Sequence, residues 1–533
     1  MALVPDGALM RRAAAGLASV AATLLRQEPG HLYGARVVLL VGTGDNGGDA
    51  LYAGELLARR GAAVTAIAAG PRLHPGGAAA LRAAGGRFTA VVPPRGPDDT
   101  RPDGGARYDA GRDARHAIGH ADLIIDGLLG IGGKGGLREP FATLAQLAAN
   151  SAGTTLAVDL PSGIDADTGE VDGPAVRADV TVTFGALKPG LLIDPGSGHA
   201  GVVELVDIGL RPYLDAPPEA SAPQAADIAD HLPRPTAESD KYRRGVLGLL
   251  AGSDRYTGAA LLATGGAVNG GAGMVRLVTA ANAAAGVRIV HPEVIITELP
   301  GEATDRSKER DLSPAERTFQ FPGDVGRVQA WVAGPGMGTD AAALDRLAGV
   351  LATNLPVLID ADGLGLLASH RELLPRAAPT LLTPHAGELG RLLRADPADV
   401  AARRLEHARR AAAEFGACVL LKGSTTVIAP PHNLDPVLVN TTGTSWLATA
   451  GTGDVLAGLA GALLAQGLAA PQAALAAAYL HGLAARIAAG EKGGGEMDGG
   501  EMDGGEAPIG ASDVVAGLHA AFLAVAGGGG NWA

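Results

Sequence analysis

The sequence predicts an α/β protein built from two doubly wound domains. Short runs of branched and aliphatic residues, such as 37–41 and Val180–Phe184, are typical of buried parallel strands. They alternate with longer helix-forming stretches, and many of them end in a Gly-rich or acidic turn. This alternation indicates parallel sheets covered by helices, and such sheets place their sites at the carboxyl ends of the strands.

The length and composition support this class. A chain of 533 residues exceeds one ordinary domain, so two or three are expected. Apolar residues make up 47% but aromatic residues only 3%, so Ala, Val and Leu must pack the core in close helix-on-sheet layers. The single cysteine, Cys418, lies in a strand pattern and reads as a core residue. One cysteine excludes a disulfide framework and a cysteine-based zinc site.

The charge and hydropathy limit the partners. A net charge of −13 argues against a broad nucleic-acid surface. Arg11 and Arg12 precede an apolar stretch that imitates a signal peptide, but it lacks a small-residue cleavage site. We therefore interpret the stretch as an amphipathic first helix, and no uninterrupted apolar run long enough to span a membrane follows it. We expect a cytoplasmic homo-oligomer that binds no nucleic acid and no membrane.

Strand patterns divide the chain into two halves around a Pro- and Ala-rich stretch. We predict a first domain over residues 1–212, a linker over 213–236 and a second domain over 237–533. Residues 93–115 are predicted to form a surface loop. Residues 490–506 repeat Gly-Glu-Met-Asp-Gly without an apolar face, so we predict a disordered insertion. Predicted strands lie at 37–41, 64–68, 123–126, 156–159, Val180–Phe184, Val202–Val206, 246–251, 275–279, Ala330–Ala333, 357–360, 380–383 and Cys418–Leu421, and a long helical region at 455–489.

The turn after the first strand, Gly42-x-Gly44-x-x-Gly47, formally matches the dinucleotide fingerprint. A nicotinamide-dependent dehydrogenase would carry an acid at the end of the next strand. Here that strand ends in Ala-Gly-Pro-Arg at 69–72, so the sequence argues against a dehydrogenase.

Polar residues lie at three separate strand ends in the first half. Asn46, Asp126 and Ser162 all offer oxygen, which a hard cation prefers, although turn and cap roles explain them equally well. Asp159 ends a strand two residues before Pro161. It suits either an acid/base aimed into a crevice or a cap.

The motifs at 44–49, 126–130 and 158–163 resemble those of the NAD(P)H-hydrate epimerase family, over residues 8–210. The resemblance implies a Rossmann-like domain that interconverts the R and S hydrates, with Asp159 as acid/base. It also implies a potassium ion held by Asn46, Asp126 and Ser162. The family carries Asn where Asp45 stands, so Asp45 adds negative charge near a phosphate site. The implied substrate contacts are Asp45, Asn46, Gly47, Gly48, Asp49, Gly130, Ile131, Gly132, Gly133, Lys134, Gly135, Gly136 and Asp159.

In the second half a Gly-rich turn at 450–453 is followed by Asp454 and an apolar helix pattern from Val455. Backbone N–H groups at a helix N-terminus form an anion site, and a carboxylate beside it can deprotonate a hydroxyl that attacks phosphorus. Further turns at strand ends, including 334–338, 360–364 and 383–388, are placed to line one cleft. Taken singly, Gly336 can serve a tight turn, His385 a helix cap and Lys422 a surface turn.

Together these turns resemble the ADP- or ATP-dependent NAD(P)H-hydrate dehydratase family, of ribokinase-like fold, over 237–490 and 507–513. The resemblance implies that Asp454 deprotonates the ring hydroxyl of the hydrate, which attacks the terminal phosphoryl group of ADP. Phosphate then leaves and NAD(P)H is restored, with magnesium bridging the nucleotide oxygens. The implied hydrate contacts are Ala259, Gly336, His385 and Asp454, and the implied nucleotide contacts are Lys422, Gly423, Ser424, Thr425, Thr426 and Gly453.

The leading hypothesis is therefore a bifunctional repair enzyme whose partners are NAD(P)H hydrates and an adenine nucleotide. The first domain would supply the S epimer that the second domain dehydrates. Two alternatives stay open: a small-molecule kinase using the same cleft, and a first domain that only binds a ligand.

Overall fold

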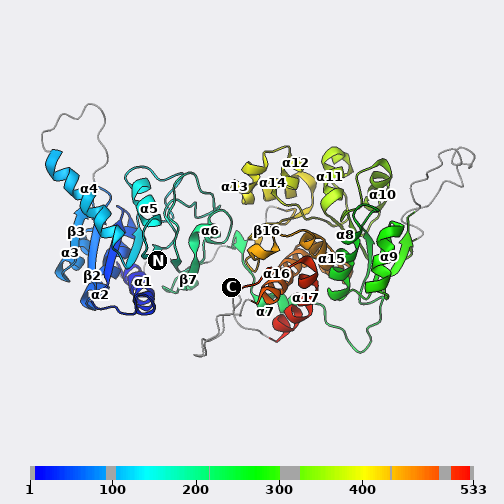
Figure 1. The fold of residues 1–533 in the computed structure, drawn as a ribbon, viewed down its shortest axis with the longest axis horizontal. Coiled ribbons are helices and arrows are strands. Elements are labelled where there is room, and N and C mark those ends of the chain that lie inside the picture. Colours follow the sequence, from blue (N-terminus) through cyan, green and yellow to red (C-terminus); the bar gives the residue numbers. More distant parts are fainter. Residues whose placement is uncertain are drawn as a thin grey trace, which may run out of the picture. The chain divides into compact units, whose positions relative to one another are not determined.

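The computed structural model describes residues 7–91, 104–214, 217–299, 325–432, 435–490 and 506–527. The chain divides into two compact units, Met1–Pro217 and Pro218–Ala533, which Figure 1 shows as ribbons. Each unit is a sheet with helices packed on it, so the predicted α/β class is confirmed. The predicted insertion at 490–506 lies, apart from its two end residues, outside the described residues.

The first unit has a parallel sheet of seven strands among its described residues, in the order β3-β2-β1-β4-β5-β6-β7. The strand order reverses between β1 and β4, and sites form at such switch points. The strands are β1 (Arg36–Val41), β2 (Ala63–Ala68), β3 (Arg87–Ala90), β4 (Leu123–Gly127), β5 (Thr154–Val158), β6 (Val180–Phe184) and β7 (Val202–Val206). The helices are α1 (Ala8–Gln27), α2 (Asp45–Arg59), α3 (Pro75–Ala83), α4 (Gly104–Gly119), α5 (Phe141–Ala149) and α6 (Ser197–Ala200).

The first helix, α1, is the one described helix long and apolar enough to cross a membrane by length and composition. Its apolar stripe, which includes Leu17 and Leu25, is buried in the same core cluster as Leu39 of β1 and Leu51 of α2. This helix is therefore accounted for as an amphipathic core helix, as the sequence predicted.

The second unit has ten strands among its described residues, in the order β11-β10-β9-β12-β13-β14-β15-β16-β17-β8. Pairing is parallel except where β16 joins β15 and β17. The order reverses between β9 and β12, which is the second switch point. The strands are β8 (Ala220–Ser221), β9 (Val246–Leu250), β10 (Met274–Thr279), β11 (Ile295–Glu298), β12 (Ala330–Ala333), β13 (Val357–Ile359), β14 (Thr380–Leu382), β15 (Cys418–Leu421), β16 (Thr426–Ala429) and β17 (Val437–Asn440).

The helices of the second unit form two groups (Figure 1). The first group packs around α15, and the second contains α11 to α14. The helices are α7 (Ala225–His231), α8 (Thr257–Asn269), α9 (Ala281–Val290), α10 (Ala341–Leu351), α11 (Ala361–Ser369), α12 (Ala386–Leu393), α13 (Pro397–Ala402), α14 (Arg404–Phe415), α15 (Thr452–Ala465), α16 (Ala470–Ala489) and α17 (Ala511–Ala526).

Glycine allows α8 and α15 to approach closely. A Cβ on Gly458 of α15 would lie 1.9 Å from the carbonyl oxygen of Ala263 in α8, and one on Gly266 would lie 2.2 Å from that of Val455. No larger residue fits at either position without separating the helices. The Gly- and Ala-rich composition therefore serves the close layers that the sequence predicted.

The structure differs from the sequence-based elements in three places. The segment 213–236, predicted as a linker, carries β8, which pairs with β17, and α7, which packs on α16 and α17. A capping box between Gln224 and Asp227 starts α7, so the prolines flank the helix and do not break it. The predicted loop 93–115 is helical from Gly104 onward, where α4 begins. The helical region 455–489 is two helices, with Pro471 in the first turn of α16.

The packing of α7 predicts that residues once taken as linker stabilise the second unit. Ile228 is fully buried in its core, so Ile228→Ala should lower the free energy of unfolding by about 2–5 kcal/mol. Urea unfolding followed by tryptophan fluorescence measures this directly, because Trp331, Trp446 and Trp532 all belong to the second unit. The exposed Asp230→Ala on the same helix is the control and should change stability by no more than about 0.5 kcal/mol. An Ile228→Ala transition that coincides with that of the wild type would contradict the packing.

Candidate active sites

The first site forms where the turns after β1 and β4 meet. A Cβ on Gly42 would lie 1.8 Å from the carbonyl oxygen of Leu128, so only glycine allows the two turns to touch. The helix α2 starts at Asp45, and the Gly-rich motif therefore forms its first turn. From this turn Asn46 Nδ2 donates to the carbonyl oxygens of Leu129 (3.0 Å) and Val158 (2.6 Å). Asn46 thus ties the ends of β4 and β5 to the start of α2.

Asp126 and Ser162 form a buried pair beside Asn46. Ser162 donates to both carboxylate oxygens of Asp126, through its hydroxyl and its backbone N–H, each at 2.8 Å. Burial raises the pKa of Asp126 to about 6, although the Ser162 hydrogen bonds act in the opposite direction. The hydroxyl of Ser162 also accepts from Leu129 N at 2.9 Å. The structure thus brings together the three residues predicted as cation ligands.

Asp159 follows β5 with a left-handed backbone, φ 68°, which Asp tolerates better than most residues. Its carboxylate oxygen Oδ1 accepts from the ammonium group of Lys188, from Thr183 Oγ1 (3.2 Å) and from Phe184 N (3.2 Å). Lys188 and Thr183 lie 29 and 24 residues further along the chain. The sequence analysis missed both; the one signal was a basic residue just after the strand that neighbours β5.

Asp49 is a second buried carboxyl in this site, and Asp45 is exposed. Burial, followed by the nearby charges of Asp159 and Asp45, raises the pKa of Asp49 to about 8. Its Oδ1 is buried without a hydrogen-bond partner among the described residues.

The Gly-rich turn 130–136 borders a small cleft. Lys134 in this turn binds Asp165 and Asp167, each at 2.9 Å, so its ammonium group is held by carboxylates. Ile131 is exposed, and Gly136 passes close to the backbone of Asp172. The cleft is lined by Leu129, Gly130, Gly133, Gly135, Pro161, Ser162, Gly163 and Ile164. The cleft therefore brings part of the predicted substrate turn together with Ser162.

The second site begins at the switch point between β9 and β12. Gly336 follows β12 with φ 58°, and a Cβ there would lie 2.7 Å from the Cβ of Ala259 at the start of α8. Gly334 lies so close to Asp360 that a Cβ would stand 1.8 Å from its carbonyl oxygen. The structure thus brings Gly336 and Ala259 together, next to the end of β13.

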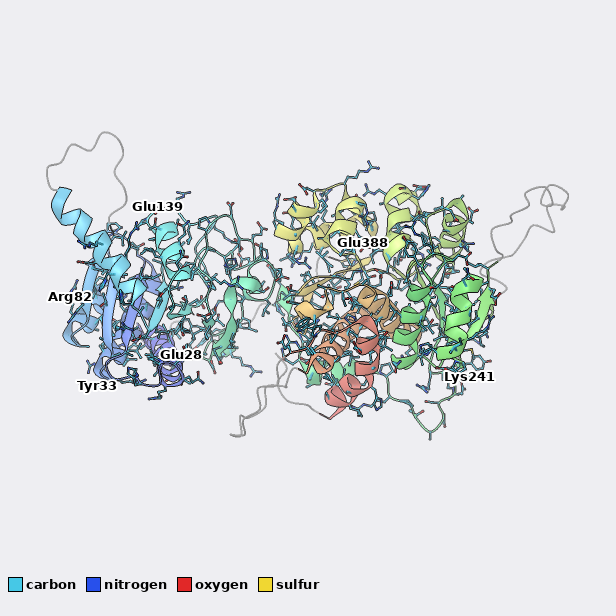
Figure 2. All side chains as sticks on the ribbon, in the orientation of Figure 1. Glu28, Tyr33, Arg82, Glu139, Lys241 and Glu388 are labelled. Carbon is cyan, nitrogen blue, oxygen red and sulfur yellow. The ribbon has the colours of Figure 1, made fainter. Side chains whose placement is uncertain are left out.

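A cluster of charges lies at the ends of β13, β14 and β15. Lys422 Nζ is 2.8 Å from Asp360 Oδ1 and 3.7 Å from Oε2 of Glu388, which belongs to α12 and is labelled in Figure 2. Burial alone would lower the pKa of Lys422, but Asp360 and Glu388 outweigh it and the pKa is raised. Burial, and then the charge of Asp360, raise the pKa of Asp454 to about 7, although Lys422 opposes this. Neither Asp360 nor Glu388 was assigned a role from the sequence.

Asp454 lies in the first turn of α15, whose N-cap Gly451 has φ 90°. A Cβ on the neighbouring Gly453 would lie 3.4 Å from Lys422 Nζ, so the helix N-terminus faces the lysine. From α16 the buried His481 lies 2.9 Å, Nε2 to oxygen, from the carbonyl of Thr452. Burial lowers the pKa of His481 to about 4, so the ring is neutral and donates Nε2–H to that carbonyl.

The turn that carries Lys422 is held by a buried arginine. Arg404 donates to the carbonyl oxygens of Leu421 (3.2 Å), Lys422 (2.9 Å) and Thr425 (3.3 Å). A Cβ on Gly423 would lie 2.2 Å from Arg404 Nη2, so this turn needs glycine where the guanidinium group crosses it. Thr425 and Thr426 are buried, and Ser424 is exposed. Arg404 is a further residue that the sequence analysis missed.

His385 caps α12. Its Nδ1 accepts from Gly387 N (3.0 Å) and Glu388 N (3.3 Å), and its own backbone N–H donates to Glu388 Oε2 (2.9 Å). The cap role left open by the sequence is therefore observed. More than half of the His385 side chain is exposed, and the cap links it to Glu388 and so to the charge cluster.

These features give each unit a site with a buried carboxyl group and a lysine close together, Asp159 with Lys188 in the first and Asp360 with Lys422 in the second. A family model described as YjeF-related protein N-terminus matches residues 6–190, and one described as NAD(P)H-hydrate dehydratase matches residues 247–503. The chain belongs to the family of bifunctional NAD(P)H-hydrate repair enzymes. The resemblances found in the sequence are thereby confirmed.

Two relatives with that name cover almost the whole chain. The chain is 45% identical over 496 residues to the enzyme of Mycobacterium leprae, covering 92% of each. It is 45% identical over 476 residues to the enzyme of Mycobacterium tuberculosis, covering 89% of this chain and 88% of the relative. It is also similar to the crystal structure of ADP/ATP-dependent NAD(P)H-hydrate dehydratase from Bacillus subtilis with ATP and Mg²⁺: 28% identity, TM-score 0.46, covering 57% of this chain and 99% of that chain.

The contact between Gly423 and Arg404 predicts a nucleotide-binding defect. Gly423→Ala should displace the guanidinium group, release the carbonyls that shape the turn and raise the Kd for ADP by about tenfold, or about 1.4 kcal/mol. Isothermal titration calorimetry measures the change. Gly365→Ala in α11 is the control, because its new methyl group meets open space and should leave the Kd unchanged. Equal affinities for both variants would show that the turn does not hold nucleotide.

Proposed function

We propose that this chain epimerises the R and S forms of NAD(P)H hydrate and dehydrates the S form to NAD(P)H, converting ADP to AMP and phosphate. The observation that carries the proposal is Asp454, at the N-terminus of α15 and beside the Lys422–Asp360 ion pair. The first unit would carry the other half of the reaction through Asp159, which follows β5. The chain would work in the cytoplasm, as a homo-oligomer.

In the second unit Asp454 would take the proton of the substrate hydroxyl as that oxygen attacks the terminal phosphoryl group of ADP. The backbone N–H groups that begin α15 would face the developing negative charge. Lys422 adds a positive charge to the same corner, and Arg404 fixes the turn that presents it. Phosphate is a better leaving group than hydroxide, so its departure completes the loss of water.

Magnesium fits this corner as a partner of the nucleotide. Among the described residues no group of three or more His, Cys, Asp or Glu is arranged to hold a metal ion. Mg²⁺ commonly binds through phosphate oxygens, water and one or two carboxylates. Asp360 and Glu388 are the carboxylates that lie against Lys422, and they would supply those ligands. The ion would neutralise the phosphate oxygens during attack.

Potassium fits the first unit through the chemistry of its donors. Asp126 contributes a buried carboxylate, Ser162 a hydroxyl and Asn46 an amide oxygen, all hard ligands. The hydrogen bonds of Asn46 and Ser162 converge on the backbone of Leu129, at the edge of the small cleft, and Asp126 accepts from the neighbouring Leu128 N. A bound cation would order the turn after β4, which the resemblance places around the substrate.

A small-molecule kinase remains the second candidate, because the same corner would phosphorylate another alcohol. The ring hydroxyl of a hydrate distinguishes the two, since only there does phosphate leave to restore a conjugated ring. The reaction products therefore decide between them.

The function is tested with separated hydrate epimers and two variants. Wild type with ADP should convert both epimers to NADH, seen by absorbance, with one phosphate released for each NADH. Asp159→Asn should slow NADH recovery from the R hydrate about 100-fold or more and spare the S hydrate. Asp454→Asn should abolish dehydration and leave epimerisation intact. A stable phosphorylated product without NADH would favour the kinase. Equal rates of NADH recovery from the R hydrate for Asp159→Asn and wild type would contradict the epimerase assignment.

The raised pKa of Asp454 predicts the pH dependence of dehydration. The base must be ionised to accept a proton, and its pKa lies at about 7. The kcat for the S hydrate should therefore rise with pH and level off above about 7. Initial rates from pH 5 to 9 at saturating ADP measure this. A flat profile would exclude Asp454 as the base.

The raised pKa of Asp126 predicts how potassium binding depends on pH. A protonated carboxyl does not bind a cation, so the K⁺ concentration for half-maximal epimerisation should rise about tenfold per pH unit below about 6. Asp126→Asn should remove the K⁺ activation. Activation that is unchanged at pH 5, or is retained in the variant, would refute this site.

A further inference from the structure

Asp49 is a buried carboxyl whose chemistry the roles given so far do not use. It lies on α2, one turn after Asn46, and is 7% exposed. Its Oδ1 is buried and lacks a hydrogen-bond partner within the described ranges. A buried carboxyl oxygen that lacks a hydrogen-bond partner destabilises the folded protein, so its presence calls for an explanation other than packing.

The position of Asn46 shows where Asp49 faces. Asn46 Nδ2 lies 2.6 Å from the carbonyl oxygen of Val158, the residue before Asp159. Residues three apart on a helix share a face, so Asp49 faces the same end of β5. The charge of Asp159 is accordingly the second cause, after burial, of the raised pKa of Asp49. The two carboxyls thus belong to one site.

The two carboxyls have opposite surroundings. Three donors converge on Oδ1 of Asp159, including the ammonium group of Lys188. Asp49 instead has burial and two like charges around it, Asp159 and Asp45, so its pKa is raised to about 8. In enzymes, two carboxyl groups placed in different environments can serve as an acid and a base at the same neutral pH. The titratable groups on α2 and on the elements packed against it include Asp45, His74, Asp126, Asp159 and, after β6, Lys188.

We propose that Asp49 is the general acid of the epimerisation and Asp159 its general base. The role rests on the proposed function, because it needs a hydrate whose hydroxyl-bearing carbon also bonds the ring nitrogen. Each contact to Asp159 uses Oδ1, so its other oxygen takes the hydroxyl proton.

The ring then opens and closes without a redox step. As the hydroxyl proton goes to Asp159, the C–O bond becomes C=O, the C–N bond breaks and Asp49 gives its proton to the nitrogen. The aldehyde turns about the adjacent C–C bond. Closure on the other face reverses each transfer, so both carboxyls regain their starting forms and no co-reactant is consumed.

The test measures R-to-S conversion by chromatography, without ADP so that the product accumulates. Asp49→Asn keeps the shape of the side chain but has no acidic proton. It should lower kcat about 100-fold or more, leave KM within about threefold and abolish the fall in wild-type kcat above about pH 8. Asp49→Glu restores an acid and should recover part of the rate. The control is Glu55→Gln, which makes the same carboxyl-to-amide replacement on the same helix outside the site and should match wild type.

Each result decides the proposal. Asp49→Asn with wild-type kcat, or with a changed KM alone, overturns the acid role while wild-type epimerisation upholds the proposed function. Wild type that does not epimerise removes the proposed function and this role with it. A pH titration of the carboxyl C=O infrared band gives a readout independent of activity. Because Asp454 also contributes to this band near pH 7, the spectrum of Asp49→Asn is subtracted from that of wild type. A difference band that is present at pH 7 and lost above about pH 8 supports the role, and the absence of a difference overturns it.

Discussion

Both sites depend on one constraint: parallel strands end at a common edge, and the strand order reverses once in each sheet. In the first unit the reversal lies between β1 and β4, and in the second between β9 and β12. The turns that follow the two strands at the reversal run to opposite faces of the sheet. A crevice is therefore left between these turns. Gly42 and Gly334 show how tightly the remaining backbone closes, since a Cβ at either would meet a carbonyl oxygen at 1.8 Å. The candidate residues of each site lie at this same edge, after the strands that flank the reversal or after their neighbours along the sheet.

The sequence predicted those parts of the sites that lie next to strands. Asn46, Asp126, Asp159 and Ser162 were found because each follows a clear apolar run, and they do meet. Lys188 was missed because its link to Asp159 depends on β5 and β6 being neighbours, which no local pattern reveals. Arg404 was missed for the same reason, since it sits on a helix and reaches the Lys422 turn through the fold. Ligand contacts assigned by resemblance stay predictions.

Some strands were predicted to the residue, and others were missed. Val180–Phe184, Val202–Val206, Ala330–Ala333 and Cys418–Leu421 agree with the structure residue for residue. The strands β8 and β11 have no buried residue, so neither shows the continuous apolar run by which a strand is found in a sequence. The stretch around β8 and α7 was misread because proline and alanine suggest a linker by composition, whereas pairing with β17 and burial of Ile228 are tertiary effects. The amino-acid composition of a segment indicates its local stiffness, but it does not indicate which distant strands and helices the segment packs against.

The two units handle crowded carboxylates in different ways, and the difference follows from their chemistry. In the second unit Lys422 lies among Asp360, Glu388 and Asp454, so its positive charge offsets the negative charges of these acids. In the first unit Lys188 binds Asp159, Thr183 and the carbonyl of Phe184, and the pKa of Asp49 is raised by burial and by the negative charges of Asp159 and Asp45. The negative charge of the exposed Asp45 therefore has a second effect besides any repulsion of phosphate. It favours the protonated form of Asp49. The first unit thus leaves the buried Asp49 beside like charges, whereas the second unit places a lysine among its acids.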